Sequence, residues 1–346
     1  MTHLEAQEIS RDRYQSFLET VPHAVFHRLE WLAVMTSIYP IDILPLGYFC
    51  NDDLVAVTPL LRRRLGPLFL WGAPLRKCPV PAATPFCAPA KMSEVILPVL
   101  REWVRCHRIG YMQVTLPPPV DNAVFVANRV EILENLELSL SGPLEELWHS
   151  LSKKTRYTVR RAVKDGVKVH WHFSADILDT QALLLHDTYG RQGRGARPNY
   201  PLALYRALLE ARQVTGLRIL CATYGNRIIA AVWLFTDARK CYYWDAAASS
   251  EGRRFNTNHL LVWCLIRWAR RRGLETLDFV GAGKGRMGER PGIGRFKRSF
   301  GARPVEYRIV YWHSLALGTA LTVYRALSRL RRMGLVNWRR TGDENN

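Results

Sequence analysis

Apolar positions in the first 140 residues alternate between helical spacing and short β-rich runs, which predicts a mixed α/β unit. Helical spacing covers 14–19, 27–39 and 92–108, and β-rich runs cover 43–49, 54–61, 111–116 and 130–140. The polar triplet Asn51-Asp52-Asp53 separates the first two runs, which are therefore predicted to form a hairpin. Eight prolines between residues 59 and 98 exclude a long helix there and predict a loop draped over the surface.

The pattern after residue 140 predicts a second α/β unit. Ser141-Gly142-Pro143 marks the start of a helix that is predicted to end at Gly166. Later elements are expected in the order helix 177–189, helix 201–214, strands 217–224, 227–236 and 241–247, helix 257–272, strand 276–280, helix 293–300 and strand 306–312. Gly225-Asn226 is the predicted turn between the first two of these strands. Three antiparallel strands that lead into a β-α-β unit predict a mixed sheet with helices on both faces.

Length and composition support two domains followed by a tail. The chain has 346 residues, of which 48% are hydrophobic, enough to form two cores. We expect an N-terminal domain at 1–140, a C-terminal catalytic domain at 141–312 and a basic amphipathic tail at 313–346. The tail could lie on an anionic membrane surface, pack on the domain or extend an RNA-binding face.

The positive charge of the chain lies entirely in its second part. The formal net charge is +19. Residues 1–150 contain 13 basic and 16 acidic residues, a net charge of −3, whereas residues 151–346 contain 36 and 14, a net charge of +22. A surplus confined to one domain indicates a partner with many negative charges.

Several classes of protein are excluded by motifs that are missing. Residues 1–10 contain no secretory signal, and no run approaches the ~18–20 apolar residues of a membrane span. A cytoplasmic location follows, with peripheral contact at the inner face of the membrane as an option for the tail. The seven cysteines form no C-x-x-C pair and the histidines lack metal-ligand spacing, so no metal site is expected. The glycine cluster 281–285 matches neither a dinucleotide-binding motif nor a P-loop and predicts a mobile loop beside a site.

One face of the predicted helix at 143–166 carries only basic residues. An ordinary solvated face usually mixes charges of both signs, and this one contains no acid. Such a face is either a solvated surface or a binding site for an anionic ligand or acceptor. The face consists of Lys153, Arg156, Arg160 and Lys164. The candidate anion- or acceptor-binding residues are Lys153, Arg156 and Arg160 on this face, and Arg191 at the start of the glycine-containing segment 191–195.

The junction 246–258 between a predicted strand and helix is a candidate phosphate site. Gly252 and neighbouring small residues would allow the backbone to approach a ligand. The N-terminus of a helix presents free N–H groups and partial positive charge, which phosphate favours. A plain capped loop, with Asn256 or Thr257 as the cap, is the alternative. The candidate donor-binding residues are Arg253, Arg254, Asn256, Thr257 and Asn258.

Three charged side chains are candidates for the chemistry. Lys297 lies between apolar neighbours on a short predicted helix and either stabilises charge that develops on a carbonyl oxygen or is a surface lysine. Asp245 and Asp278 fall in predicted strands, where aspartate is disfavoured. Either carboxylate could orient an amine nucleophile, act as a general base or pair with an arginine.

Short motifs in a consistent order resemble one family. They are Phe26-His27 with Trp31-Leu32; Ser152-Lys153-Lys154-Thr155-Arg156 with Arg160-Arg161-Ala162; Tyr243-Trp244-Asp245-Ala246-Ala247; Asn258-His259-Leu260-Leu261-Val262-Trp263; Leu277-Asp278-Phe279; Pro291-Gly292-Ile293; and Phe296-Lys297 with Phe300-Gly301. This order resembles the Fem-like branch of the GNAT acyltransferase superfamily. The resemblance covers residues 25–312.

The resemblance implies two GNAT-like domains, with the reactive cleft mainly in the second. It implies transfer of an acyl or aminoacyl group to an amine, or a hydroxyl in its place, on a cell-envelope glycan or a lipid-linked or other precursor. No tightly bound cofactor is implied, and the acyl donor is either acyl-CoA or aminoacyl-tRNA. By position, Lys297 would contact the phosphate or carbonyl of the donor. The segment 246–257 lacks the [QR]-x-x-G-x-[GA] loop of ordinary GNAT enzymes, which together with the charge of +22 favours tRNA. A non-catalytic RNA- or membrane-binding module with the same fold is the alternative.

Overall fold

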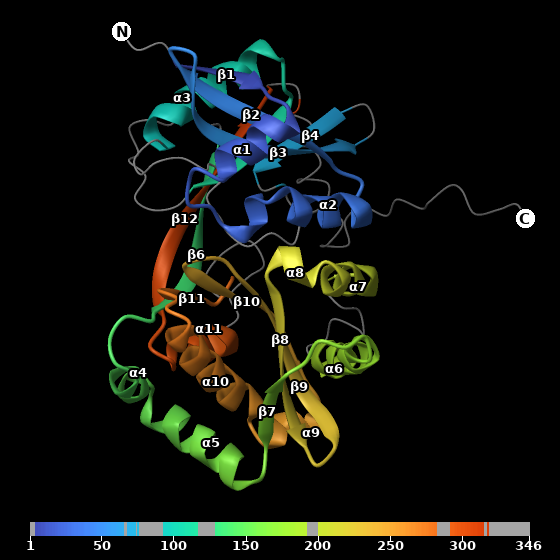
Figure 1. Cartoon of the computed structure of the whole chain (residues 1–346), viewed down its shortest axis with the longest axis vertical. Helices are drawn as coiled ribbons and strands as arrows, with labels where there is room; N and C mark the ends of the chain where they lie inside the picture. Colours follow the sequence, from blue (N-terminus) through green and yellow to red (C-terminus); the bar gives the residue numbers. More distant parts are fainter. Residues whose placement is uncertain are drawn as a thin grey trace, which may run out of the picture.

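The computed structural model describes residues 4–65, 68–73, 75, 93–116, 129–191, 200–281, 291–314 and 317. These residues form a long molecule with the N-terminal half at one end and the C-terminal half at the other (Figure 1). The N-terminal half contains β1 (Leu4–Glu8), α1 (Arg11–Leu18), η1 (Val25–His27), α2 (Leu29–Ile38), β2 (Asp42–Cys50), β3 (Asp53–Leu65), β4 (Leu68–Ala73), α3 (Ser93–Cys106), β5 (Tyr111–Leu116) and β6 (Arg129–Ser139).

The C-terminal half follows with a larger helical content. It contains α4 (Leu144–Ser150), α5 (Lys153–Lys164), β7 (Lys168–Trp171), α6 (Ile177–Arg191), α7 (Leu202–Glu210), α8 (Arg212–Thr215), β8 (Leu217–Tyr224), β9 (Arg227–Thr236), β10 (Lys240–Ala248), α9 (Ser250–Arg254), α10 (Thr257–Arg271), β11 (Thr276–Asp278), α11 (Pro291–Arg298) and β12 (Arg303–His313).

One mixed sheet of 12 strands runs through both halves, in the order β1-β2-β3-β4-β5-β12-β6-β11-β10-β9-β8-β7. Each half repeats the same plan: a strand, helices, three antiparallel strands, a helix and a parallel strand. The parallel pairs are β4 with β5 and β10 with β11, and the other pairs are antiparallel. The predicted mixed α/β fold with two tandem GNAT-like units and helices on both sheet faces is confirmed.

The two halves exchange strands at the centre of the sheet. β6, which ends the N-terminal half, pairs with β11 of the C-terminal half. β12, which ends the C-terminal half, pairs with β5 on one side and β6 on the other. The backbone hydrogen bonds of each half are therefore completed by a strand from the other half. The domain limits at residues 140 and 312 remain predictions.

Aromatic contacts also join the halves. The ring of Phe26 in η1 lies 4.8 Å from that of Tyr242, and Trp31 of α2 lies 4.6 Å from Phe235. Trp31 and Phe235 are fully buried. The motif that begins at Phe26 is thus the contact of the first half with the sheet of the second.

Two cores lie on opposite faces of β8–β10. One core packs α4, α5, α10 and α11 against one face, and the other packs α2, α6 and α7 against the opposite face. A third core lies between α3 and the strands of the N-terminal half. β10 therefore has its successive side chains in different cores, which matters for the site below.

Some sequence predictions differ from the structure. The helix predicted from 143 to 166 is two helices, because Leu151 is extended and the hydroxyl of Ser152 accepts a hydrogen bond from Thr155 N to cap α5. The proline-rich stretch 59–98 is not one loop, since β3 continues to Leu65 and β4 follows. The helix predicted at 201–214 is divided into α7 and α8 at Ala211. The strand β7 and the short helix α9 had no sequence prediction. Most of the tail predicted at 313–346 and most of the 281–285 glycine cluster lie outside the described residues.

The close packing of α9 against β9 is expected to require glycine at position 252. A Cβ atom at this position would lie 2.2 Å from the carbonyl oxygen of Ile229. The Gly252→Ala variant should lose about 1–3 kcal/mol in free energy of unfolding, because backbone has to move to make room. Urea denaturation measures this.

Gly190 in α6 supplies a matched control. A Cβ atom there meets nothing within 4 Å, so Gly190→Ala should keep or raise stability, by up to about 1 kcal/mol. Equal stability of the two variants would contradict the role assigned to Gly252.

Candidate active site

The pairing of two strands in the central sheet ends beside two of the predicted catalytic residues, Asp278 and Lys297. We call this point the fork. β10 and β11 pair in parallel only from Lys240 with Thr276 to Tyr242 with Asp278. β11 then ends, whereas β10 continues to Ala248. Beyond Tyr242 the two strands part, and buried charged side chains lie at this point.

Lys297 of α11 is buried beside the end of β11. Its side chain is 5% exposed, so it is not a surface lysine. The Nζ atom donates hydrogen bonds to the carbonyl oxygens of Phe279 and, at 3.0 Å, Val280. Burial lowers the pKa of the Lys297 ammonium to about 8, and the nearby Asp278 opposes that shift.

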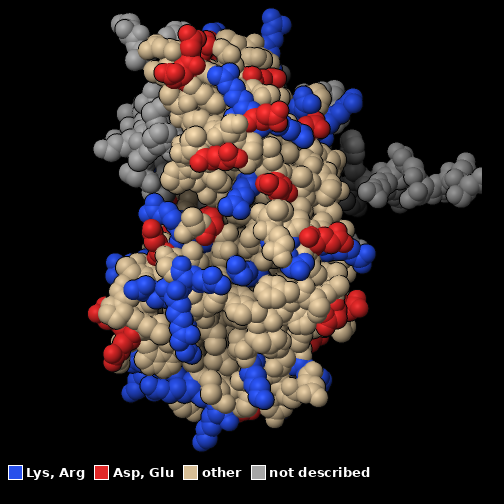
Figure 2. Space-filling view, in the orientation of Figure 1, with Lys and Arg blue, Asp and Glu red and all other residues tan. Residues whose placement is uncertain are grey.

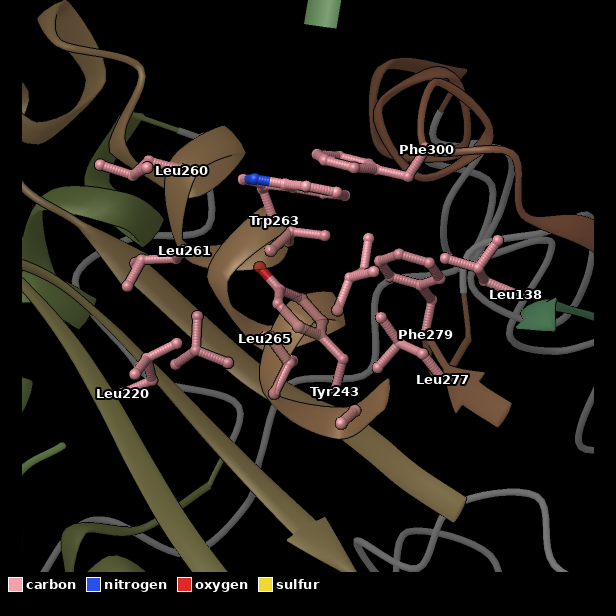
Figure 3. Close-up of a cluster of buried hydrophobic side chains, with 14 of the residues drawn as sticks. Leu138, Leu220, Tyr243, Leu260, Leu261, Trp263, Leu265, Leu277, Phe279 and Phe300 are labelled. Atoms are coloured by element: carbon pink, nitrogen blue, oxygen red, sulfur yellow. The ribbon is translucent and has the colours of Figure 1, made fainter. Parts of the chain in front are cut away.

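The rings of Tyr243 and Phe279 lie close to the ammonium group of Lys297. Nζ lies 5.9 Å from the centre of the Tyr243 ring and 6.0 Å from that of Phe279. Figure 3 shows these two rings in one buried cluster with Phe300. The ammonium group therefore sits at the edge of an apolar core, where a charge interacts more strongly than in water.

Asp278 lies at the fork with one oxygen unused. It is 1% exposed, and its Oδ1 accepts hydrogen bonds of 2.8 Å from Asn135 Nδ2 and from Val280 N. Its Oδ2 is buried and has no hydrogen-bond partner among the described residues. Burial, with a contribution from the neighbouring Glu137 carboxylate, raises the pKa of Asp278 to about 6. A carboxyl with this pKa and a free oxygen can accept a proton near neutral pH.

A β-bulge aims Asp245 toward α6 and α7. The register of β10 with β9 shifts between Tyr243 and Asp245, so that Trp244 and Asp245 both point to the same face. Bulges often re-aim a side chain beside an active site. Without this one, the alternation of the strand would turn Asp245 into the other core with Tyr243.

Asp245 is held by neutral hydrogen-bond donors. Its Oδ2 accepts from the hydroxyl of Tyr205 at 2.7 Å and from Gln181 Nε2 at 3.4 Å. Burial raises the pKa of Asp245 to about 6. Among the described residues, no hydrogen bond or ion pair joins Asp245 to Asp278 or Lys297, so the structure does not place the three candidates in one cluster.

The candidate donor-binding residues occupy α9 and the start of α10. Arg253 donates to the carbonyl of Ala248 at 2.9 Å, and Arg254 lies over the ring of Phe255 at 4.7 Å. Both arginines fall in the last turn of α9, where the helix dipole favours cations. Their positions therefore have a structural explanation besides donor binding. Gly252 packs against β9, so its small size serves packing.

The three remaining candidate donor-binding residues, at the N-terminus of α10, differ in their hydrogen bonds. Asn256 is the N-cap residue, with a φ of 54°, but its side chain makes no capping hydrogen bond. Thr257 is buried and donates to the carbonyl of Gly252 at 3.0 Å. Asn258 Oδ1 is buried without a hydrogen-bond partner in the described part of the chain.

The candidate anion-binding residues on α5 are partly used within the fold. Arg156 donates to the carbonyls of His149 and Leu151, where it caps the end of α4, and Arg160 lies 5.3 Å from the ring of Trp148. Lys153 and Lys164 are exposed. Lys and Arg side chains gather over the lower half of the molecule (Figure 2), where Figure 1 places α4 and α5.

Arg191 at the end of α6 lies near Arg253. Burial and the like charge of Arg253 lower the pKa of the Arg191 guanidinium, and Asp187 opposes this. The structure thus brings one predicted acceptor-binding residue and one predicted donor-binding residue into electrostatic contact.

Sequence reasoning missed the partners of the two carboxylates. Asn135, Gln181 and Tyr205 are almost completely buried. Gln181 shares the buried face of α6 with Leu184 and Leu185, and a polar residue at an apolar position of a helix is the signal that could have identified it.

Comparisons with known proteins identify the domain. Residues 152–298 match the family model described as acetyltransferase (GNAT) domain. The crystal structure of FemX is 14% identical, with a TM-score of 0.64, over 88% of this chain and 96% of that one. A comparison with curated proteins gave no match.

Two further solved structures share the fold. The C-terminal domain of a putative lysylphosphatidylglycerol synthetase from Agrobacterium fabrum is 12% identical, with a TM-score of 0.59, over 91% of this chain and 96% of that one. A tandem GNAT protein from the clavulanic acid biosynthesis pathway is 13% identical, with a TM-score of 0.52, over 90% and 98%. These matches confirm the resemblance to the GNAT superfamily and, in fold, to its Fem-like branch.

Two searches of the described residues were negative. Within the ranges given above, no group of three or more histidine, cysteine, aspartate or glutamate side chains could hold a metal ion. No helix in the described part of the chain is long and apolar enough to cross a membrane.

Asp245→Asn is expected to stabilise the protein above pH 6. Burial raises the pKa of Asp245 from 3.8 to about 6, so the folded state binds this proton more tightly than the unfolded state does. The ionised form therefore lowers stability as pH rises through this range, by up to about 3 kcal/mol at pH 7.5. Urea denaturation should show a gain for the variant at pH 7.5 that shrinks toward pH 4.

Asp179→Asn, at an exposed carboxylate of α6, is the matched control for the loss of one negative charge. A gain for Asp245→Asn that does not change with pH would refute the burial argument.

Proposed function

We propose that this chain, which carries a GNAT acetyltransferase domain at residues 152–298, transfers an acyl or aminoacyl group to an amine, or to a hydroxyl in its place. The acceptor is a cell-envelope glycan or its precursor. The observation that carries the proposal is the fork between β10 and β11, with Lys297 and Asp278 buried at its apex.

The reaction needs a stabilised oxyanion, which Lys297 is placed to provide. Two of its N–H groups bind the carbonyls of Phe279 and Val280, which fixes the ammonium and leaves one N–H for a ligand. As the nucleophile attacks the acyl carbonyl, negative charge develops on its oxygen, and a fixed, partly desolvated ammonium favours that charge.

The reaction also needs a proton acceptor. The attacking nitrogen forms the new C–N bond, the bond from the carbonyl carbon to the donor's sulfur or oxygen breaks, and the nitrogen loses a proton. The unused Oδ2 of Asp278 is suited to receive that proton directly or through water. Asp245 is the second candidate for this role. The leaving thiolate or alkoxide is protonated from solvent or from the same carboxyl group.

Two acyl donors are candidates. The charge of +22 in residues 151–346 and the exposed Lys153 and Lys164 favour aminoacyl-tRNA. The description of the matched domain as an acetyltransferase favours acyl-CoA. An envelope acceptor is supported by the FemX fold and by the neighbour whose name specifies lysylphosphatidylglycerol.

A turnover assay tests the proposal. Purified protein is mixed with labelled acetyl-CoA or with charged tRNA, and with amino sugars, peptidoglycan precursors and anionic lipids as acceptors. Transfer from one donor identifies it. A non-catalytic RNA- or membrane-binding module would retain the basic surface and give no transfer from either donor across the acceptor set.

Lys297→Ala should reduce kcat at least tenfold, because the oxyanion loses its charged donor. Arg295→Ala on the same helix is the matched control, because Arg295 is exposed and its replacement also removes one positive charge. Steady-state kinetics on the two variants decide the matter. Unchanged kcat in Lys297→Ala, or equal losses in both variants, would remove Lys297 from the site.

The pH profile of kcat/KM should be bell-shaped. The base must be ionised, so activity should rise with pH through the Asp278 pKa of about 6. Lys297 must be charged, so activity should fall as pH rises through its pKa of about 8. In Asp278→Asn the acid limb should disappear together with most of the rate. A profile that is flat from pH 5 to 9 would contradict both assignments.

A further inference from the structure

The surroundings of Asp245 differ from those of an internal ion pair. Asp245 is 9% exposed, and aromatic rings from β10, from α7 and from Tyr200 just before α7 lie around it. Tyr200 stacks on Trp244 with ring centres 4.8 Å apart, and Tyr205 lies 5.6 Å from the same ring. Burial raises the pKa of both Tyr200 and Tyr205, and the charge of Asp245 raises each further, so both tyrosines are neighbours of Asp245.

Beside Asp245 lies a buried hydrogen-bond acceptor that has no donor in the described part of the chain. Gln181 is fully buried, and its Oε1 has no hydrogen-bond partner among the described residues. Its Nε2 on the same amide group is 3.4 Å from Asp245, so the unused Oε1 is also close to that carboxylate. No lysine, arginine or histidine in the described ranges is hydrogen-bonded or ion-paired to Asp245. A buried carboxylate without a cation and a buried amide oxygen without a donor are both costly.

A primary ammonium group would remove both costs. It carries one positive charge and three N–H donors, so it can bind a carboxylate and an amide oxygen at once. The faces of tyrosine and tryptophan rings attract cations and pack well against methylene groups. A phosphate or carboxylate ligand would be repelled, and an uncharged alcohol would leave the carboxylate without a counter-charge.

We propose that Asp245 and Gln181 bind a primary ammonium group of a substrate, with Tyr200, Tyr205 and Trp244 packed around its carbon chain. This assignment rests on the proposed transferase function. Asp245 lies past Tyr242, the register partner of Asp278, by three residues that include a bulge, a span of about 7–10 Å along β10. The bound ammonium is therefore a group that stays protonated while another part of the substrate reacts at the fork.

A binding experiment without turnover tests the site. n-Butylammonium chloride is titrated into the full chain, and binding is followed by calorimetry and by tryptophan fluorescence, with n-butanol and sodium chloride as ligand controls. Saturable binding of n-butylammonium alone is expected. Asp245→Asn should weaken it at least tenfold, whereas Asp278→Asn, the same change at the other buried aspartate, should keep it within about twofold.

Other outcomes separate this assignment from the transferase proposal. No saturable binding to the wild-type chain, or equal binding to a folded Asp245→Asn variant, would overturn the ammonium site. If binding depends on Asp245 but the chain transfers no acyl group, the result supports the ammonium site and counts against the transferase function.

Kinetics then show which substrate carries the group. If the acceptor does, Asp245→Asn should raise KM for an acceptor with a second amino group and leave KM for the donor unchanged. If an aminoacyl donor carries the group as a side-chain amine, Asp245→Asn should raise KM for the donor and leave KM for the acceptor unchanged. No change in either KM would overturn the role in substrate recognition.

Discussion

The short parallel pairing of β10 with β11 is the constraint on which the rest of the site depends. Three residue pairs hold the strands together, and the pairing ends at Tyr242 and Asp278. β6 supports this end from the other side, because it pairs with β11 and continues its hydrogen bonding to Phe279. Since β6 belongs to the first half of the chain, the fork of the second half forms only when both halves have folded together.

Burial of charge at the fork has an energetic cost that the surrounding polar groups reduce. Asn135 and Val280 N hold one oxygen of Asp278, and the carbonyls of Phe279 and Val280 hold the ammonium of Lys297. The pKa of the acid is raised and that of the lysine is lowered, which shows that desolvation still outweighs these contacts. Groups poised in this way near neutral pH are typical of functional sites, where stability is exchanged for reactivity.

Local sequence signals predicted many of the helices and strands, but they did not predict contacts between residues far apart in the chain. The strands at 111–116, 217–224 and 227–236 have the predicted bounds because periodicity and turn residues are local features. Asp245, Asp278 and Lys297 were predicted as candidates because a charge in an apolar run conflicts with its surroundings, and all three are buried. The contact of Asn135 with Asp278 spans 143 residues, and the bulge at Trp244 depends on the register with β9, so no local pattern could reveal either. The division of the helix at Ser152 was a missed local signal, since serine is a preferred N-cap.

The two buried aspartates look alike in the sequence and differ in what surrounds them. Each has a pKa raised by burial to about 6, so acidity alone does not separate their roles. Within the described residues, Asp278 has a lysine and an unused oxygen beside it, whereas Asp245 has neutral donors, aromatic rings and no cation. An anionic carboxylate next to an ammonium is suited to moving a proton, and one in an aromatic box is suited to holding a cation. The bulge in β10 creates this difference, because it turns Asp245 out of the core that contains Tyr243 and into the box formed by α6 and α7. A single extra residue in one strand thus gives two similar carboxylates different surroundings on the same sheet.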